Sequence, residues 1–301
     1  MAENRAPKAP GRPARSKFTF TGLWQGRRTV TLALPLLLCF GAPSLWPGGT
    51  LIAAAEAKAL PPRLPAPAGP LSAAEYEALL QRYVDSEGRV DYAALKSKDA
   101  DTVEKLYAVI AATGPDKTPE LYKGKSAALA YYLSAYNLLV WKNILDSLPK
   151  LKQVDEGGYR FFREPAFMVD GKEVTLDELE KKVIRPRFND GRIHFALNCA
   201  SGGCPKLPRT AFTAAKVDQQ LNAEAKRFCN EPRNVRYDAA QKTVTLSMIF
   251  KWYKDDFGGS EPAVLAFINR YRAPADQIPA GTQIKYVDYD WRMNDKSLPV
   301  R

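Results

Sequence analysis

The residues of this chain best suited to chemistry lie in one short segment, residues 192–205, which reads R-I-H-F-A-L-N-C-A-S-G-G-C-P. It holds His194, the only histidine of the 301 residues, and two of the four cysteines, Cys199 and Cys204. An imidazole beside a thiol lowers the thiol pKa from its ordinary value of about 8.5. The resulting thiolate can attack a carbonyl carbon. The segment therefore predicts a site of thiol chemistry.

The spacing within the segment favours one of the two cysteines as the partner of the histidine. The apolar run from Arg192 to Cys199 predicts a buried strand, and the Ser-Gly-Gly that follows predicts a loop. Side chains alternate along a strand, so His194 and Cys199, five residues apart, should face opposite sides of a sheet. Cys204 lies beyond the loop and can fold back toward the imidazole. The predicted pair is therefore His194 as base with Cys204 as nucleophile.

Such a pair needs supporting groups. The backbone N–H groups of Gly202 and Gly203 are candidates to hold a developing oxyanion. A third polar side chain would orient the imidazole, and Glu180 and Asn137 are candidates for this role. Because Asn137 falls in an apolar helix, the alternative is that its buried amide bonds neighbouring backbone, as most buried amides do.

Two other interpretations of the cysteines remain open. Cys199 and Cys204 can form a disulfide that closes the small loop, which an exported protein would favour. One histidine and two cysteines can also bind a metal, but the spacing H-x4-C-x4-C matches no usual zinc pattern and a fourth ligand is missing. We therefore predict no metal and no cofactor.

The first 57 residues predict a signal peptide for export. Residues 1–29 are polar and basic, residues 30–46 form an apolar run, and Ala55-Glu56-Ala57 is a typical cleavage signal. Arg27-Arg28 before the apolar run also suits a twin-arginine signal. The alternative, an uncleaved membrane anchor, is disfavoured because the run is short and interrupted by Pro35. The predicted location is periplasmic or secreted, with no stable membrane span after cleavage.

Removal of this leader changes both the charge and the cysteine count. Of the net charge of +11, seven basic and two acidic residues belong to the leader, so +6 remains on the exported part. These charges are well mixed, and no Lys/Arg stripe interleaves with aromatics, which argues against nucleic acid as a partner. Three cysteines remain, so at least one thiol is unpaired within the molecule. Cys229, near the end of a predicted helix, is expected to be a small buried residue.

The remaining chain predicts one α+β domain, residues 72–296, after an Ala/Pro-rich linker at 58–71 and before a tail at 297–301. A long helix over 126–148 is apolar on nearly all sides, which predicts a central core helix. Hairpins are expected over 159–174, with a turn at Asp170-Gly171, and over 235–246. A last strand is expected over 284–291. Other helices are predicted at 72–85, 103–112, from Thr175 onward, 213–229, 247–257 and 260–271. The predicted fold is thus an antiparallel sheet of short strands and hairpins packed on the long core helix.

The segment R-I-H-F-A-L-N-C-A-S-G-G-C-P and a second one at 246–257, L-S-M-I-F-K-W-Y-K-D-D-F, resemble the domain of unknown function 547 family. Shorter matches support the resemblance, and they are 88–95, 135–137 and 289–291. The chain departs from the family in its core helix, where Y-Y-L-S-A-Y-N stands for the usual F-W-I-N-A-Y-N, and at Lys181, where a histidine is common.

The resemblance implies a single exported α+β domain of unassigned activity. An analogy to papain-like thiol enzymes would make His194 the base, Cys204 or Cys199 the nucleophile, and Asn137 or Glu180 the orienting group. The expected function is a thiol-dependent hydrolase or acyl transferase acting on a small-molecule or peptide substrate. The alternative is a non-enzymatic envelope or binding protein whose cysteines are structural.

Overall fold

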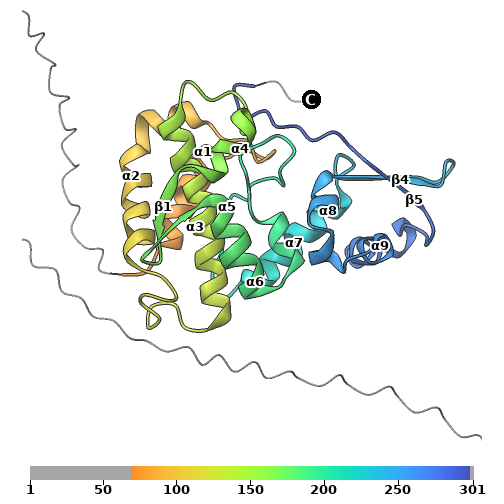
Figure 1. Ribbon diagram of the computed structural model, residues 1–301, viewed down its shortest axis with the longest axis horizontal. Coiled ribbons are helices and arrows are strands. Elements are labelled where there is room, and N and C mark those ends of the chain that lie inside the picture. The colour runs from red at the N-terminus through yellow and green to blue at the C-terminus, as the bar shows by residue number, and fades with distance from the viewer. Residues whose placement is uncertain (1–68, 299–301) are drawn as a thin grey trace, which may run out of the picture. The chain divides into compact units, whose positions relative to one another are not determined.

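A computed structural model describes residues 69–298 of the chain (Figure 1). The predicted signal peptide at 1–57, most of the linker at 58–71 and the last residues of the tail lie outside the described residues. The described part is an α+β domain, as expected. Its main helices are α1 (Ala73–Tyr83), α2 (Tyr92–Ala112), α3 (Gly124–Ser147), α4 (Glu156–Arg163), α7 (Val217–Asn230), α8 (Met248–Trp252) and α9 (Glu261–Asn269). None of the described helices is both long and apolar enough to cross a membrane.

Helix α3 is the centre of the larger hydrophobic core. It contacts α2, the short α5 (Leu176–Glu178) and α7, and it is buried along nearly its whole length, from Ala128 to Leu145. A helix that is apolar on all sides is most stable when other elements cover every side of it. The prediction of a central core helix is confirmed.

Local capping signals determine where several elements begin. The Ser72 side chain accepts a hydrogen bond from the backbone N–H of Glu75 at the start of α1. Thr175 and Glu178 form a complete capping box at the start of α5. Asp170 and Gly171 both have positive φ in the turn between β1 (Ala166–Val169) and β2 (Lys172–Thr175), as the short hairpin turn requires. These three predictions are confirmed.

The strands form two small sheets. β1 and β2 pair antiparallel, and β3 (Val235–Asp238) and β4 (Thr243–Leu246) do the same. These two hairpins follow the predicted antiparallel pairing, whereas β5 (Gln283–Tyr286) pairs parallel to β4, so the second sheet is mixed. The chain between them passes through α8 and α9, and such a long crossover allows a parallel return.

The predicted strand over residues 192–199 is also wrong. Gly191–Phe195 form a 3-10 helix, η2, whose N-cap Asp190 accepts from the backbone N–H of Arg192. The apolar run reflects burial between two hydrophobic clusters, because Ile193 packs in the larger cluster around α3 and Phe195 in a smaller one around α7, α8 and α9. Without a strand, alternation no longer separates His194 from Cys199. Residues 156–163, also predicted in part as strand, form α4.

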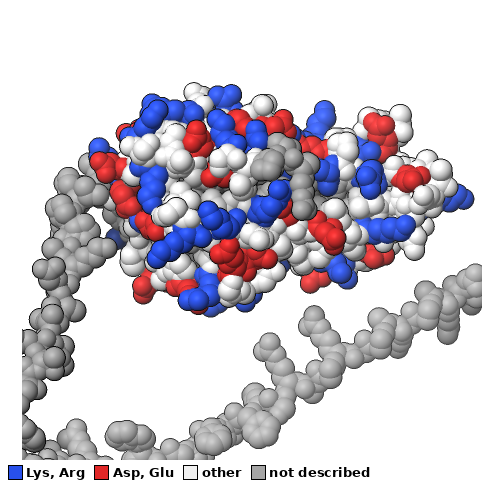
Figure 2. All heavy atoms as spheres, turned by 90° about the horizontal axis from the view of Figure 1, so that it is seen from above, with Lys and Arg blue, Asp and Glu red and all other residues white. Residues whose placement is uncertain are grey.

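Charged side chains of both signs are mixed over the surface. On the face drawn in Figure 2, Lys and Arg interleave with Asp and Glu over the described residues. Many of them pair along helices, for example Lys182 with Glu178. This mixture matches the well-mixed charges of the sequence after residue 57.

Candidate functional site

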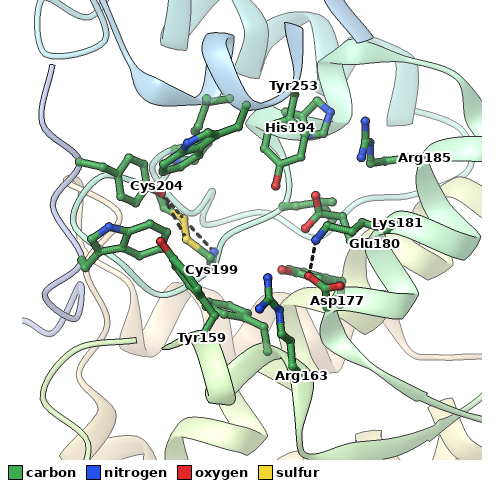
Figure 3. A pocket seen from close by; sticks show the side chains of 18 residues that line it. Tyr159, Arg163, Asp177, Glu180, Lys181, Arg185, His194, Cys199, Cys204 and Tyr253 are labelled. Atoms are coloured by element: carbon green, nitrogen blue, oxygen red, sulfur yellow. Dashed lines mark hydrogen bonds and ion pairs between the residues drawn. A yellow bond between two sulfur atoms is a disulfide. The ribbon is translucent and has the colours of Figure 1, made fainter. Parts of the chain in front are cut away.

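The segment 192–205 borders a cavity of about 360 Å³ (Figure 3). Residues far apart in the sequence meet here. α3 contributes Tyr136, the segment around α5 contributes Glu180, and the motif 246–257 contributes Trp252 and Tyr253. Cavities of this size with a few polar groups among aromatic walls are where small ligands bind. The other lining residues include Tyr159, Arg163, Asp177, Lys181, Arg185, His194, Cys199, Cys204, Tyr289 and Trp291.

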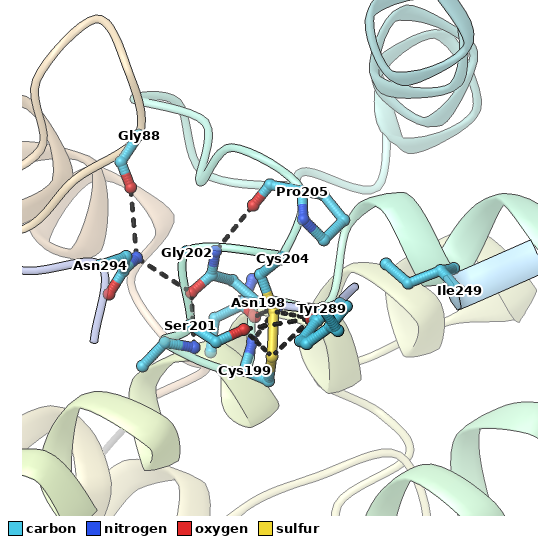
Figure 4. Close-up of a disulfide and its surroundings, with 12 residues drawn as sticks. Gly88, Asn198, Cys199, Ser201, Gly202, Cys204, Pro205, Ile249, Tyr289 and Asn294 are labelled. Atoms are coloured by element: carbon cyan, nitrogen blue, oxygen red, sulfur yellow. Dashed lines mark hydrogen bonds between the residues drawn. A yellow bond between two sulfur atoms is a disulfide. The ribbon is translucent and has the colours of Figure 1, made fainter. Parts of the chain in front are cut away.

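Cys199 and Cys204 are joined by a disulfide at the wall of this cavity (Figures 3 and 4). Of the interpretations left open by the sequence, the disulfide is therefore the one that the structure contains. The two sulfurs differ in accessibility, because Cys199 is half-buried and Cys204 is 4% exposed. A ligand in the cavity reaches the sulfur of Cys199 more readily.

Hydrogen-bond donors converge on Sγ of Cys204, and two hydroxyl oxygens lie close to Sγ of Cys199. The backbone N–H of Cys199 donates to Sγ of Cys204 at 2.9 Å, and the Tyr289 hydroxyl donates to the same sulfur at 3.4 Å. Sγ of Cys199 lies 3.1 Å from Oγ of Ser201 and 3.4 Å from the Tyr289 oxygen. Burial raises the pKa of Tyr289, so its hydroxyl keeps its proton and remains able to donate.

The loop between the cysteines uses its glycines for close packing. The N–H of Gly202 donates to the Arg292 carbonyl and that of Gly203 to the Asp290 carbonyl, both at 2.8 Å. The expectation that these amides hold an oxyanion is wrong, because backbone acceptors already occupy them. A Cβ at Gly203 would lie 2.7 Å from the Tyr289 ring. Glycine therefore allows the ring that contacts the disulfide to approach.

Asn137 holds the chain that leads into the disulfide. Its side-chain amide donates to the Ala196 carbonyl at 2.9 Å and accepts from the backbone N–H of Asn198 at 2.8 Å. Asn198 in turn donates to the Pro205 carbonyl and accepts from the N–H of Ala200 (Figure 4). Of the two roles considered for Asn137, these contacts match the bonding of neighbouring backbone.

His194 lies on the cavity wall, but its Nε2 atom is engaged elsewhere. Nε2 is 2.6 Å from Oδ2 of Asp256, and Arg185 donates to the same carboxylate at 2.7 Å. The imidazole stacks on Tyr253 at 3.8 Å between ring centroids, and its side chain is 3% exposed. The hydrogen bond from His194, together with Arg185, holds the pKa of Asp256 well below its usual range against the opposing effect of burial.

The structure therefore does not contain the predicted thiolate–imidazole pair of His194 and Cys204. The two residues border one cavity, but the sulfur is bonded to Cys199 and Nε2 is bonded to Asp256. Nor do Asn137 or Glu180 bond the imidazole. The carboxylate of Asp256 is the group that bonds the imidazole.

Glu180 reaches the cavity from a π-helix, η1 (Leu179–Ile184). Single turns of this kind are frequent at functional sites. Its Oε1 atom is buried and has no hydrogen-bond partner among residues 69–298. Burial raises the pKa of Tyr253, and the nearby Glu180 carboxylate raises it further. Lys181, which replaces the common family histidine, forms an ion pair with Asp177 at 2.5 Å.

The third cysteine of the domain is remote from this chemistry. Cys229, at the end of α7, is fully buried, and burial raises the pKa of its thiol to about 12. It packs in the smaller hydrophobic cluster, as expected for a small buried residue. Among the described residues no group of His, Cys, Asp and Glu side chains is arranged to hold a metal ion.

Sequence reasoning missed most of the aromatic wall and the partner of the histidine. Tyr289 and Trp291 pack at 4.4 Å between ring centroids, Trp252 stacks on Trp291, and Tyr159 contacts Trp291 edge-on. The signal that could have found them is the pair of motifs K-W-Y-K-D-D-F and Y-D-W. Both motifs support the family resemblance, but neither by itself points to the cysteines.

The fold and this site define a single α+β domain whose ligand-sized cavity is walled by a disulfide and aromatic rings. The family described as "Protein of unknown function, DUF547" matches residues 120–229. The matched stretch includes α3, Glu180 and the disulfide loop, which confirms the resemblance to this family. Neither the curated proteins nor the solved structures include a match to the chain.

Proposed function

We propose that this domain is a thiol enzyme in which the Cys199–Cys204 disulfide exchanges with a thiol substrate bound in the cavity. The observation that carries the proposal is the convergence of hydrogen-bond donors on Sγ of Cys204 at the cavity wall. Donors to sulfur favour the thiolate over the thiol. A thiolate that is stabilised in this way is a better leaving group in exchange.

The exchange has two steps. A substrate thiolate attacks Sγ of Cys199, the more accessible sulfur, and a mixed disulfide forms while the Cys199–Cys204 bond breaks. The electron pair leaves on Cys204, where the N–H of Cys199 and the hydroxyl of Tyr289 stabilise the thiolate. A second substrate thiolate attacks the substrate sulfur and releases Cys199. Two thiols become one disulfide, the protein gains two electrons, and a disulfide oxidant must restore the protein for another turnover.

We also propose that the protein is exported to the periplasm or secreted, in line with the leader at 1–57. An oxidising compartment allows a disulfide of this kind to persist. Sequencing the N-terminus of the protein from the exported fraction should show cleavage after the A-x-A signal near Ala57. A protein that keeps residues 1–57 and stays in the cytoplasm would contradict this part of the proposal.

The test of exchange compares the native disulfide with its variants. We expect C204S to form a mixed disulfide rapidly at Cys199 with a small aromatic disulfide probe, and C199S to react slowly at the buried Cys204. We expect Y289F to reduce more slowly than wild type, since it loses the hydroxyl that donates to Sγ of Cys204. Y237F, a half-buried tyrosine on β3, is the matched control.

The outcome that would overturn exchange is a disulfide that thiols reduce only when the protein unfolds. The cysteines would then be structural, as in the alternative of a binding protein. A second candidate activity, the thiol hydrolase or acyl transferase predicted from the sequence, becomes available only after reduction. It is favoured by one observation, that His194 and Cys204 border the same cavity. Thioester hydrolysis by the reduced protein, lost in both C204S and H194A, would support it.

A further inference from the structure

Two charged side chains of the cavity form no ion pair with another described residue. Glu180 has a buried carboxylate oxygen without a hydrogen-bond partner. Arg163, exposed at the end of α4, makes no ion pair with residues 69–298 and lies 5.5 Å from the Tyr159 ring. The remaining ionisable side chains of the cavity have partners. Asp177 pairs with Lys181, and both Arg185 and His194 bond Asp256.

A second cavity of about 460 Å³, which Cys204 also borders, has no unpaired basic side chain among its lining residues. Basic side chains that line it form ion pairs with acidic neighbours, and these pairs are Arg89 with Asp85, Lys206 with Glu87 and Glu231, and Arg233 with Glu231. Arg233 also donates to the carbonyls of Gly202 and Cys204. The guanidinium of Arg233 therefore holds the loop between the two cysteines, and it is not free to bind a ligand.

The unpaired groups of the first cavity are complementary to a zwitterion. An unpartnered buried carboxylate oxygen is unfavourable, and a bound ammonium group that donates to it removes that cost. Aromatic rings that line the same cavity, among them Tyr253, Trp252 and Trp291, are groups that cations also favour. Arg163 offers the planar fork that binds carboxylates with two parallel hydrogen bonds.

We propose that the cavity binds a low-molecular-weight thiol with an α-amino-acid zwitterion, its ammonium group on Glu180, its carboxylate on Arg163 and its sulfur toward Cys199. In Figure 3 the side chains of Glu180, Arg163 and Cys199 surround the same hollow. This inference rests on the proposed exchange, because it names the substrate class of that reaction. Free cysteine and its close relatives have the required chemistry.

The test uses four thiols with the oxidised full-length protein. Cysteine carries both charges, N-acetylcysteine lacks the ammonium group, cysteine methyl ester lacks the carboxylate, and 2-mercaptoethanol lacks both. The measured quantity is the rate of disulfide reduction divided by the thiolate concentration of each reagent. We expect cysteine to react at least roughly tenfold faster than 2-mercaptoethanol by this measure, the effect of about one charge-assisted hydrogen bond.

Two variants separate the two contacts. E180Q keeps the shape of the side chain and should remove the advantage of the ammonium-bearing thiols. R163Q should remove the advantage of the carboxylate-bearing thiols. The matched controls are E120Q and R236Q, which neutralise exposed charges outside the cavity and should leave all four rates unchanged.

The outcomes distinguish this inference from the proposed function. Equal rates for all four thiols would overturn the inference and leave exchange intact, whereas failure of all four to reduce the native protein would overturn exchange. Calorimetric binding of S-methylcysteine, which cannot exchange, provides a readout independent of reaction. Binding to wild type that is lost in E180Q is expected, and no binding to wild type would overturn the inference.

Discussion

At the residue scale, the only histidine serves as the partner of a carboxylate in this structure. His194 and Arg185 both bond Asp256, and Tyr253 covers the imidazole. The bond between His194 and Asp256 connects η2 to the residues after α8, 62 positions later in the chain. Because these two partners depress the pKa of Asp256, the ionisation of this carboxyl is coupled to folding.

We expect this coupling to appear as acid sensitivity. Because the pKa of Asp256 is depressed in the folded protein, its contribution to stability is present above the unfolded pKa of about 4 and is lost as the pH falls through the folded value. D256N should therefore flatten the decrease in the free energy of unfolding below pH 4, and should cost about 1–3 kcal/mol at pH 7. Chemical denaturation over pH 2.5–7 measures both.

The control for this prediction is D255N, which changes the exposed neighbouring carboxylate. Its pH profile should follow that of wild type. A D256N profile parallel to wild type across the whole range would show that Asp256 is not coupled to folding in this way.

At the element scale, α3 and the C-terminal segment both hold the disulfide loop. Asn137 on α3 bonds the backbone just before Cys199, and the segment around Tyr289 bonds the glycines just after it. The reactive loop has little regular structure of its own, so its geometry depends on these two neighbours.

N137A should destabilise the domain by about 2–4 kcal/mol, because it leaves the buried Ala196 carbonyl and Asn198 N–H without their partner. Thermal or urea unfolding measures the loss. N230A, which removes an exposed amide from the end of α7, is the control and should cost less than about 1 kcal/mol. Equal losses in the two variants would mean that Asn137 does not hold the loop.

G203A should displace the Tyr289 ring, since a Cβ would lie 2.7 Å from it. We expect a loss of about 1–3 kcal/mol in stability from overpacking and slower reduction of the disulfide by thiols. G69A, where a Cβ meets nothing within 4 Å, should change neither quantity. A G203A protein that reduces at the wild-type rate would separate Tyr289 from the chemistry of the sulfurs.

At the scale of the whole molecule, the domain places its three cysteines in two different environments. The disulfide faces a cavity, whereas Cys229 is enclosed by the second hydrophobic cluster. Burial, and not redox pairing, protects the remaining thiol.

Alkylation followed by peptide mapping checks this arrangement. The native oxidised protein should show no modification at Cys199, Cys204 or Cys229, and unfolding without reduction should expose Cys229 alone. Mild reduction of the native protein should label Cys199 before Cys204 and leave Cys229 unmodified. Labelling of Cys229 in the native state would contradict its burial, and labelling of all three without reductant would contradict the disulfide.

The sequence by itself determined the features that depend on neighbouring residues. The caps at Ser72 and Thr175, the turn at Asp170-Gly171 and the all-apolar α3 follow from local propensity and periodicity. The spacing of Cys199 and Cys204 also placed a disulfide among the open interpretations. These features require no knowledge of what packs against them.

Only the tertiary structure decided the conformation of residues 191–195 and the side chains that contact His194 and the two sulfurs. A short apolar run cannot be distinguished as strand or helix by its pattern alone, and η2 formed because its residues are shared between two hydrophobic clusters. Asp256, the partner of His194, lies 62 residues away in the chain. Tyr289, which contacts the sulfurs, lies 85 residues from Cys204. Pairs at such separations are selected by the packing of the whole domain, which has no local signature in the sequence.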